Sequence, residues 1–386
     1  MGPSVQSDME FNRVFDAGQL LSKKSFFLFG PRNTGKTTLL AQQLPDLKRI
    51  DLLDPEVLAA YASRPKRLLE LDDERTSAVI IDEIQKLPAL LDVVQLAIQQ
   101  QKKRFILTGS SARKLKRQGV NLLGGRAWEA HLHPLTWKEI ADFDLMRYLS
   151  RGGLPGIYLS ENWKEELKAY LALYLQEEII QEAATRNVPA FSRFLDILGA
   201  TSGEELVIES IASDAGVKAS TVRNYMDILR DTLLVFEALP YTKTQARKAV
   251  SRSKVWVFDV GLANTLSKRT VDQEGSAAFG KAFEHFIVRE VQSYLSYKRA
   301  EQRLHYWRTF DQYEVDIIVP GSFGCEVKAS ERVTDKHLQS LRALKKEKLL
   351  PRHFVVSREP ERRTVDGIEI LPWQEFMHEL WAGRLL

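Results

Sequence analysis

The sequence contains very little cysteine, no long hydrophobic run and no large excess of charge of either sign. One cysteine among 386 residues excludes a disulfide framework and favours a cytoplasmic protein. No apolar run approaches the ~18 residues that a membrane-spanning helix needs, and the opening MGPSVQSDME lacks the apolar segment of a signal peptide. The formal charge is +4, from 55 basic and 51 acidic residues, so any nucleic-acid surface must be a local patch. We therefore expect a protein without a membrane partner.

A phosphate-binding loop is the clearest motif present. Residues 30–37, GPRNTGKT, match the pattern G-x-x-x-x-G-K-[ST] at every position. Residues 26–29 are apolar and predict a buried strand, and residues 38–43 predict a helix. A strand, a glycine-bounded loop and a helix aim backbone N–H groups at a polyphosphate. We expect the chain to bind ATP, with Lys36 reaching the β- and γ-phosphates and Thr37 ligating Mg²⁺.

A second apolar stretch, residues 78–81, ends in the carboxylate pair Asp82 and Glu83. Doubly wound sheets place their ligands at the carboxyl ends of such strands. Asp82 can hold the Mg²⁺ shell, and Glu83 can polarise the water that attacks the γ-phosphate. A third strand is predicted at residues 105–108, and either Thr108 or Ser110 can sense the γ-phosphate, with a simple turn as the alternative. The expected nucleotide contacts are Gly30, Pro31, Arg32, Asn33, Thr34, Gly35, Lys36, Thr37, Thr38, Asp82 and Ser110.

Residues 11–133 alternate short apolar strands with helical stretches, which is typical of a parallel α/β sheet. Near the end of this block, Arg126 follows a Gly-Gly pair and precedes a strand expected at residues 127–132. Such an arginine can contact the transition-state phosphate, in cis or from a neighbouring subunit. The alternative is a surface arginine after a glycine turn.

The middle of the chain is predicted to be helical and to contain a helix-turn-helix. A helix is expected at residues 163–182, after a break at residues 151–156, RGGLPG, which suits a lid over bound nucleotide. The helix-turn-helix bends at Gly216, its second helix covers residues 219–230, and a wing strand is expected at residues 233–239. The next stretch has five basic residues and no acid: Lys243, Arg247, Lys248, Arg252 and Lys254. DNA contact through this surface is expected, and a lid or partner dock is the alternative.

The C-terminal third carries another group of acidic and basic residues. A helix is predicted at residues 278–295, followed by strands at residues 304–308, 314–319 and 325–327. Glu326 and Lys328 project to one face of a strand, and Asp316 joins them if the last two strands are neighbours. Asp316 and Glu326 can then hold Mg²⁺, and Lys328 can steady an attacking water, for phosphodiester cleavage. An exposed strand that alternates acid and base is the alternative. Glu284, near the start of the helix, completes the set.

The chain resembles, nearly end to end, the bacterial and archaeal AAA-type ATPases that carry a C-terminal domain of unknown function with the restriction-endonuclease-like fold. The motifs that carry the resemblance are GPRNTGKT, AVIIDE, ILTGSSA, LLGGR with HPLTWKEI, GGLPG, KVWVFDVGLAN, GKAFEHFIVRE and EVDIIV with EVKAS. The resemblance implies that Asp316, Glu326 and Lys328 match the PD-(D/E)xK endonuclease signature and that Glu284 matches its helix acid. It also implies a homo-oligomer, because AAA-type proteins commonly present an arginine to a neighbour's nucleotide.

The fold class expected from these features is α/β with four parts. They are an AAA-type P-loop ATPase core (residues 1–136), a helical lid (137–200), a winged-helix domain (201–250) and a nuclease-like domain (251–386). The function expected is that of an ATP-hydrolysing DNA remodeller or translocase, or an ATP-dependent nuclease for branched or broken DNA. The alternative is a nucleotide-controlled regulatory switch whose nuclease-like domain binds DNA or a protein without cutting.

Overall fold

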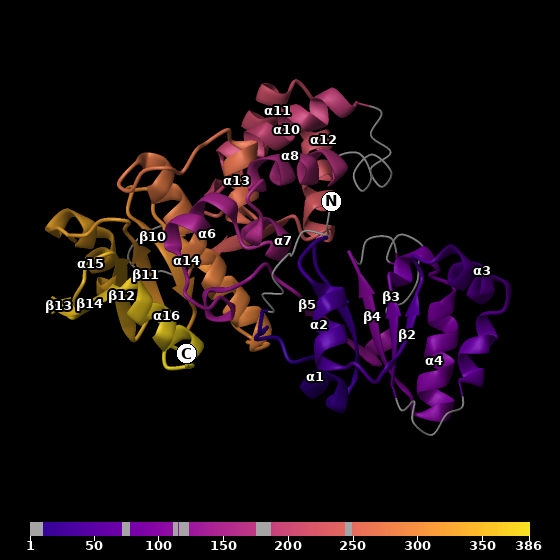
Figure 1. The fold of residues 1–386 in the computed structure, drawn as a ribbon. Helices are drawn as coiled ribbons and strands as arrows, with labels where there is room; N and C mark the ends of the chain where they lie inside the picture. The colour runs from indigo at the N-terminus through magenta and orange to yellow at the C-terminus, as the bar shows by residue number, and fades with distance from the viewer. Residues whose placement is uncertain (1–10, 72–77, 111–114, 116–122, 175–186, 244–248) are drawn as a thin grey trace.

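The structure is a computed structural model that describes residues 11–71, 78–110, 115, 123–174, 187–243 and 249–386. Two separate sheets organise the chain, one in the N-terminal third and one that extends to the C-terminus (Figure 1). A group of helices from the middle of the sequence lies above and between them. The two sheets therefore define two regions, each with its own hydrophobic cores.

The N-terminal sheet has five strands in the order β2-β3-β4-β1-β5. The bounds are β1 Ser25–Phe29, β2 Lys48–Asp51, β3 Ala78–Asp82, β4 Arg104–Gly109 and β5 Ala127–His131. Every neighbouring pair is parallel, which confirms the predicted parallel α/β sheet. Parallel strands place all their carboxyl ends at one edge, where the phosphate loop and the Asp82-Glu83 pair follow β1 and β3.

Helices cover both faces of this sheet. Their bounds are α1 Ala17–Lys23, α2 Lys36–Gln43, α3 Pro55–Ser63 and α4 Leu90–Gln101, with a 3-10 helix η1 at Pro65–Glu70. Phe26 and Leu28 of β1 pack in one cluster with residues of α1 and α2. Phe27 packs in the opposite cluster with residues of α3 and α4. Because alternate residues of a strand point to opposite faces, a continuous apolar run in β1 buries both faces.

The helices of the middle region are α6 Leu145–Arg151, α7 Pro155–Leu159, α8 Trp163–Tyr174, α10 Val188–Ala200, α11 Ile208–Ala215, α12 Ala219–Asp231 and α13 Val260–Leu266. The predicted helix-turn-helix corresponds to α11 and α12. Gly216 ends α11 in the left-handed region with φ 68°, and Val217 N donates to Ala212 O at 3.0 Å. This is a common glycine-dependent way to end a helix. Residues 175–182 of the predicted helix 163–182 lie outside the described residues.

The second sheet has nine strands in the order β13-β14-β12-β11-β10-β9-β7-β8-β6. The bounds are β6 Glu204–Glu205, β7 Val235–Pro240, β8 Lys254–Val257, β9 His305–Arg308, β10 Glu314–Val319, β11 Phe323–Val327, β12 Arg352–Ser357, β13 Arg363–Val365 and β14 Ile368–Pro372. The expected boundary between residues 250 and 251 falls between β7 and β8, which pair with each other. Because β7 also pairs with β9, the winged helix and the C-terminal strands share one sheet. The four-part division stays a prediction.

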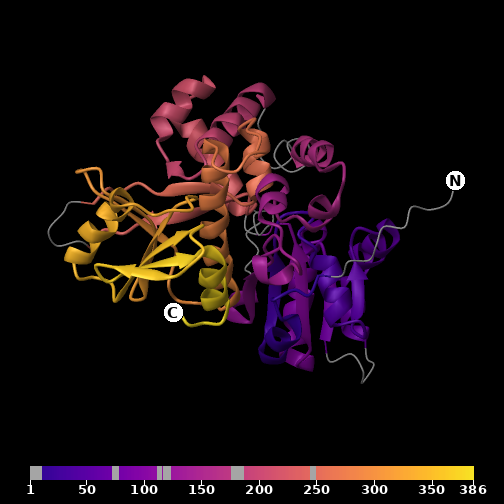
Figure 2. The same ribbon diagram turned by 60° about the vertical axis from the view of Figure 1, so that its left-hand side comes forward.

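Helix α14, Ala277–Tyr297, runs between the C-terminal sheet and the N-terminal region (Figure 2). The helix predicted at residues 278–295 corresponds to α14. Even Arg289 and Glu290 are buried, because α14 packs on the sheet and also contacts the segment that follows β5. With α16 (Trp373–Trp381) it covers one face, while α15 (Gln339–Lys346) covers the other.

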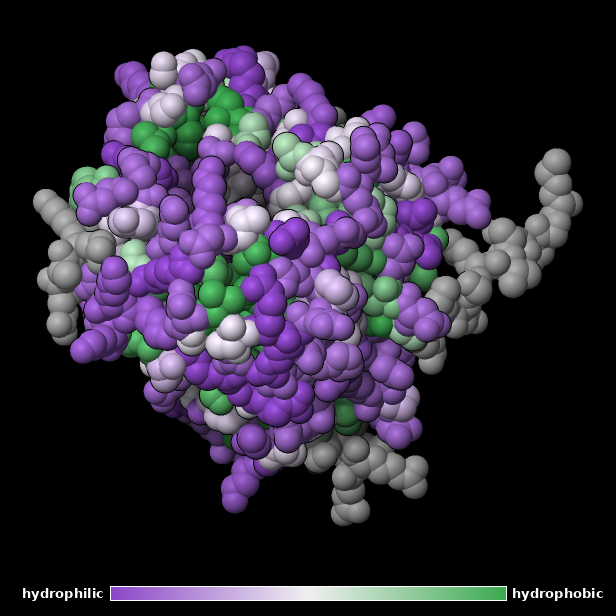
Figure 3. All heavy atoms as spheres, turned by 90° about the vertical axis from the view of Figure 1, so that its left-hand side faces the viewer, coloured by the Kyte–Doolittle hydropathy of each residue, from purple (hydrophilic) through white to green (hydrophobic). Residues whose placement is uncertain are grey.

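The face that carries the C-terminal sheet is mainly hydrophilic, and its hydrophobic residues gather in small separate patches (Figure 3). Within the described residues, every helix is too short or too polar to cross a membrane.

Candidate functional site

The phosphate loop is shaped around Lys36. Helix α2 begins at this residue, directly after Gly35, whose φ of 88° lies in the left-handed region. A Cβ on Gly30 would lie 2.5 Å from Leu132 O, so only glycine fits there. The Lys36 side chain is buried, and its Nζ donates to Gly30 O at 2.6 Å and to Pro31 O at 3.1 Å. The loop thus forms a cradle around a lysine at the N-terminus of a helix, which fits a polyphosphate.

The other loop residues divide into an inner set and an outer set. Thr34 is buried, and its Oγ1 donates to Pro31 O at 2.9 Å. The exposed residues, which leave one side of the cradle open, are Arg32, Asn33, Thr37 and Thr38. The Arg32 carbonyl accepts a hydrogen bond from the Tyr170 hydroxyl at 3.2 Å, so α8 touches the loop.

Asp82 ends β3 beside this loop, as the sequence predicts. Its Oδ2 accepts from Thr37 Oγ1 at 3.2 Å and also from Arg49, while Oδ1 accepts from Thr108 Oγ1. The two expected Mg²⁺ ligands, Thr37 and Asp82, therefore lie together, and their oxygens are the donors that Mg²⁺ prefers. The residues fit a nucleotide with its metal ion. When bound, the ion would neutralise phosphate charge.

Glu83 and Ser110 lie at the same sheet edge. Glu83 N donates to Thr108 Oγ1 at 3.1 Å, and its carboxylate accepts from Gln85. Glu83 has φ 58°, a left-handed conformation that costs a non-glycine residue about 1–3 kcal/mol and often marks a functional position. Ser110 is buried directly after β4. Of the two candidate γ-phosphate sensors, Thr108 is the one that contacts both Asp82 and Glu83.

Arg49 and Gln85 are residues of this edge that the sequence did not reveal. Arg49 lies opposite Ile80 in the β2–β3 register and therefore on the same face as Asp82. The contact between Arg49 and Asp82 could not be predicted from the sequence, because it depends on β2 lying next to β3. Gln85 has a buried Oε1 without a hydrogen-bond partner in the described part of the chain.

Arg13, also unpredicted, connects the phosphate loop to α14. Its Nη1 donates to Thr34 O at 2.7 Å and its Nη2 to His133 O at 2.6 Å. Its Nε lies 3.0 Å from Glu139 Oε1 in a buried ion pair. The Tyr297 hydroxyl accepts from His133 N at 3.1 Å and from Arg13 Nη2 at 3.3 Å. A short chain of hydrogen bonds therefore joins the loop to the end of α14.

The Gly-Gly-Leu-Pro-Gly turn lies against the same loop. A Cβ on Gly35 would be 3.8 Å from Pro155 Cγ. The Asp259 carboxylate holds the turn from the other side, because its Oδ2 accepts from Gly153 N at 2.7 Å. A Cβ on Gly152 would meet this carboxylate at 2.1 Å. The position is compatible with the predicted lid, and it also ties the turn to the start of α13.

Arg126 does not approach its own chain's phosphate loop. It directly precedes β5, whose first residue pairs with Ser25, the first residue of β1. Parallel pairing places it at the edge opposite the loop, which follows the other end of β1. With the Gln99 amide correctly oriented, Arg126 Nη2 donates to Gln99 Oε1 at 2.7 Å. The alternative in which Arg126 acts in cis is therefore corrected, and action on a neighbouring subunit stays a prediction.

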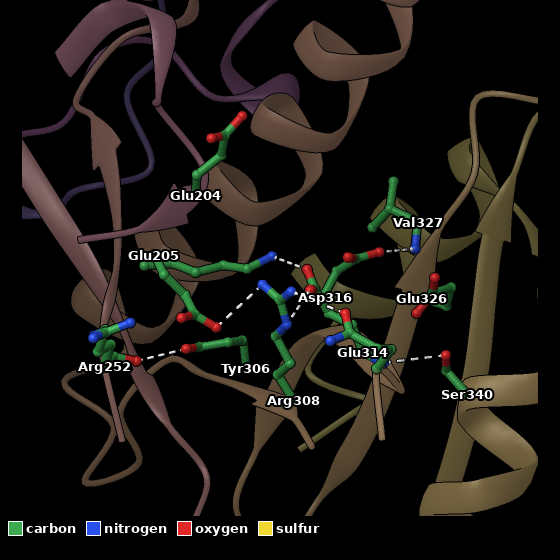
Figure 4. A network of polar contacts seen from close by, with 12 residues as sticks. Glu204, Glu205, Arg252, Tyr306, Arg308, Glu314, Asp316, Glu326, Val327 and Ser340 are labelled. Atoms are coloured by element: carbon green, nitrogen blue, oxygen red, sulfur yellow. Dashed lines mark hydrogen bonds and ion pairs between the residues drawn. The ribbon is translucent and has the colours of Figure 1, made fainter. Parts of the chain in front are cut away.

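Asp316 and Glu326 lie close together in the nine-stranded sheet (Figure 4), and we call the group of charged side chains around them the C-terminal pocket. β10 and β11 are antiparallel neighbours, and Val327 N donates to Asp316 Oδ2 at 2.8 Å. Lys328 Nζ lies 2.6 Å from Glu326 Oε1. The other carboxylate oxygen of Glu326 is buried and has no hydrogen-bond partner among the described residues. Asp316, Glu326 and Lys328 are thus brought together as the sequence predicts.

Glu284 enters this pocket from α14. Burial and the nearby Asp316 carboxylate raise the pKa of Glu284 to about 8. The same causes raise the pKa of Glu326 well above its ordinary value. Lys254 was predicted to lie on a DNA-contacting loop, which is wrong. Its side chain is buried and ion-paired with Glu314, because β8 turns it toward the carboxylates of the pocket.

The pocket fits a metal ion only in part. Within the described ranges, no group of three or more His, Cys, Asp or Glu side chains is arranged to hold one. Asp316 and Glu326 supply two carboxylates, and the unpartnered Glu326 oxygen remains as an acceptor. Metal binding by this pair stays a prediction.

The helix-turn-helix surface is less basic than its sequence indicates. Arg223 of α12 is exposed, but it lies 3.2 Å from Glu209 in an ion pair. Arg230 is paired with Asp227 at 2.9 Å. Arg252 is exposed, whereas Arg247 and Lys248 of the predicted basic loop lie outside the described residues.

Comparison with protein families agrees with the geometry of the first site. Residues 22–141 match a family model described as an AAA domain. Residues 142–273 and 279–376 match two models described as domains of unknown function, DUF8612 and DUF4143. The chain therefore combines an AAA-type P-loop ATPase domain with a C-terminal DUF4143 domain. The matches support an ATPase that uses a nucleotide, while the restriction-endonuclease-like fold is a finer expectation that they leave open.

Two similar proteins are both described as uncharacterized proteins. An uncharacterized protein of Mycobacterium tuberculosis is 25% identical over 317 residues, covering 78% of this chain and 69% of the relative. One from Methanocaldococcus jannaschii is 26% identical over 275 residues, covering 62% of each chain.

Two solved structures show a weak likeness. One is a Signal Transduction ATPase with Numerous Domains with a tetratricopeptide repeat sensor from Pyrococcus horikoshii, at 14% identity and TM-score 0.21, covering 75% of this chain and 47% of that one. The other is domain III of the Thermotoga maritima replication initiation protein DnaA, at 14% identity and TM-score 0.22, covering 49% of this chain and 82% of that one. TM-scores this low do not bear on function.

Proposed function

We propose that the protein hydrolyses ATP and uses the cycle to act on DNA, as a remodeller or translocase or as an ATP-dependent nuclease for branched or broken DNA. Support for hydrolysis comes from the edge where Lys36, Thr37 and Asp82 converge beside Glu83. Lys36 would bind phosphate oxygens, Thr37 and Asp82 would hold Mg²⁺, and Glu83 would take a proton from the attacking water.

The observation that carries the DNA part is the pocket of Asp316, Glu326 and Lys328. Two adjacent carboxylates and a lysine suit a divalent ion and a phosphodiester, because the ion offsets their repulsion and draws in phosphate oxygens. Lys328 Nζ, held 2.6 Å from Glu326, can steady an attacking water or contact the phosphate. Cleavage and grip without cleavage remain the two forms of this proposal.

The test combines ATPase rates with DNA integrity in Mg²⁺, using labelled single-stranded, duplex, forked and four-way DNA. We expect DNA to raise the ATPase rate of the wild type and not that of Glu83→Gln. Lys328→Ala should abolish any cleavage and leave DNA binding in place. Glu331→Gln, which neutralises an exposed carboxylate paired with Arg358, is the control. A rate that no DNA form changes, together with absence of DNA binding, would contradict the proposal.

A nucleotide-controlled switch is the second candidate, and the Arg13 contacts favour it. The phosphate loop reaches α14 through Arg13 and Tyr297, and Glu284 on the same helix enters the C-terminal pocket. Such a connection can pass a nucleotide-dependent change to the pocket without cleavage. Slow ATP turnover that DNA leaves unchanged, with DNA or protein binding that differs between ATP and ADP, would favour this candidate.

Homo-oligomerisation is part of the proposal, with Arg126 acting on a neighbour's nucleotide. Mixing Arg126→Ala subunits with Lys36→Ala subunits should restore activity that neither variant has alone. A protein that stays monomeric by light scattering while it hydrolyses ATP at the full rate would exclude this arrangement.

A further inference from the structure

Among the residues that the structure describes, Arg49 is the one cationic side chain that contacts Asp82, and the proposed ATP site assigns it no role. It lies on β2 with Lys48 before it, and its register partner on β3 is Ile80. Its guanidinium contacts Asp82 Oδ2, the oxygen that also accepts from Thr37 Oγ1 at 3.2 Å. Arg49 therefore belongs to the group of side chains at the phosphate end of the site.

The surroundings of Arg49 leave it able to bind a further anion. Asp82 is already hydrogen-bonded by Thr37 and Thr108 without it. Arg49 Nε is buried and has no hydrogen-bond partner in the described part of the chain. Its side chain is 29% exposed, whereas that of Asp82 is 5% exposed. A guanidinium with an unused donor and one open side matches the planar, bidentate contacts that arginine makes with phosphate.

Charge balance points in the same direction. A buried carboxylate needs one close cation, and in this structure Arg49 supplies it. Once a polyphosphate and its counter-ion enter beside Thr37, Asp82 gains a second positive neighbour, and Arg49 becomes surplus there. A terminal phosphate bound there would add negative charge at this edge, and the released guanidinium would be drawn to it.

We propose that Arg49 binds the terminal phosphate of the bound nucleotide and so distinguishes ATP from ADP. This inference rests on the proposed ATP site and adds a residue that reads the γ-phosphate from within the same chain. Lys36 is expected to reach the β-phosphate, which ATP and ADP share, as well as the γ-phosphate, so it discriminates less between them than a residue that contacts the γ-phosphate alone. Arg126, which lies at the opposite sheet edge, is not needed for this task.

The test measures equilibrium binding of fluorescent ATP and ADP analogues, first in EDTA and then in Mg²⁺. For Arg49→Gln we expect ATP affinity to fall on the order of ten- to hundredfold, as for loss of a charged hydrogen bond. ADP affinity should change by less than about threefold on the same scale. Arg49→Lys keeps the charge and loses the bidentate geometry, so its affinity for ATP should lie between those of the wild type and Arg49→Gln. Lys48→Gln removes an equal charge from an exposed position of the same strand and is the matched control.

The outcomes separate this inference from the proposed site. If the wild type binds neither analogue, both the proposed ATP site and the inference about Arg49 are wrong. A wild type that binds both, with Arg49→Gln weakening ATP and ADP by the same factor, overturns the inference alone, because Arg49 then only supports Asp82. If Arg49→Gln folds poorly, Arg49→Gln with Asp82→Asn restores a neutral pair. In EDTA this double variant should no longer bind the ATP analogue more tightly than the ADP analogue. If it still binds the ATP analogue more tightly, the proposal is overturned.

Discussion

The nucleotide edge of the five-stranded sheet and the C-terminal pocket of the nine-stranded sheet both combine carboxylates with basic side chains, but they are assembled differently. At the first, three strand ends and one loop supply every group, and Asp82 is fully hydrogen-bonded. At the second, β8, α14, β10 and β11 contribute one or two groups each, and one Glu326 oxygen has no hydrogen-bond partner within the part of the chain that the structure describes.

The difference shows how charge is balanced in the two regions. The pKa of Glu284 rises to about 8 because it is buried beside other carboxylates, even though Lys254 and Lys328 lie close by. Such a pocket gains more from an added cation than one in which each carboxylate already has its donors. The phosphate loop, in contrast, offers backbone donors and a lysine to an added anion. We therefore expect the first region to accept negative charge and the second to accept positive charge.

The largest effect is expected at the nucleotide edge, where a single group carries each task. Lys36→Ala should abolish detectable nucleotide binding. Glu83→Gln should keep binding and lower hydrolysis on the order of a hundred- to ten-thousandfold, the usual contribution of a general base. Phosphate release and analogue binding measure the two effects, with Lys23→Ala on α1 as the control. A Glu83→Gln protein that hydrolyses ATP at the normal rate would remove Glu83 as the base.

The next effect tests whether the second region accepts a cation. Asp316→Asn and Glu326→Gln should each weaken Mn²⁺ binding by at least about tenfold in the absence of nucleotide, because each removes a hard oxygen ligand. ATP hydrolysis should change little, since neither residue lies near the phosphate loop. Calorimetry with Mn²⁺ provides the measurement, and Glu331→Gln provides the control. Unchanged Mn²⁺ binding in both variants would show that the second region does not accept a cation through these carboxylates.

A smaller effect is expected where the two regions are joined. Tyr297→Phe removes the acceptor of His133 N, at 3.1 Å, and should lower the free energy of unfolding by about 1–3 kcal/mol, the cost of an unsatisfied buried donor. It also frees Arg13 from α14, so binding of ATP and events at the C-terminal pocket should become less dependent on each other. Urea unfolding measures the first change, and Tyr294→Phe on the same helix is the control. If stability is unchanged, the hydrogen bond does not hold the regions together.

The smallest effect concerns pH and a buried histidine of α14, His285. Burial lowers the pKa of His285 to about 3, and its Nε2–H donates to Val257 O at 2.8 Å. As pH falls below ~6.5, the unfolded chain takes up this proton first, so His285 makes stability fall with acidification down to about pH 3. His285→Gln keeps a donor and should flatten this fall between pH 7 and 5. Urea unfolding at several pH values gives the slope, with the exposed His378→Gln for comparison. An equal slope in His285→Gln would contradict the assignment.

Several features of the site were determined by the sequence because they depend on neighbours along the chain. The phosphate loop, the Asp82-Glu83 pair after β3 and the positions of β10 and β11 along the chain all follow from local patterns. Gly30 and Gly35 could be recognised because a tight approach and a left-handed conformation each require glycine. Glu326 and Lys328 share a face because strand residues alternate with period two.

Other features were decided only by tertiary structure. The partner of Asp82 depends on β2 lying next to β3, and the role of Arg13 depends on three segments that meet around His133. Lys254 belongs to a basic run in the sequence, but in the structure it is buried and paired with Glu314. Arg126 lies near the end of the ATPase core in the sequence, but the register of β5 places it at the sheet edge opposite the phosphate loop. Composition shows that a charge is present. Which opposite charge it meets is set by the pairing of strands distant in sequence, because only burial together makes their interaction strong.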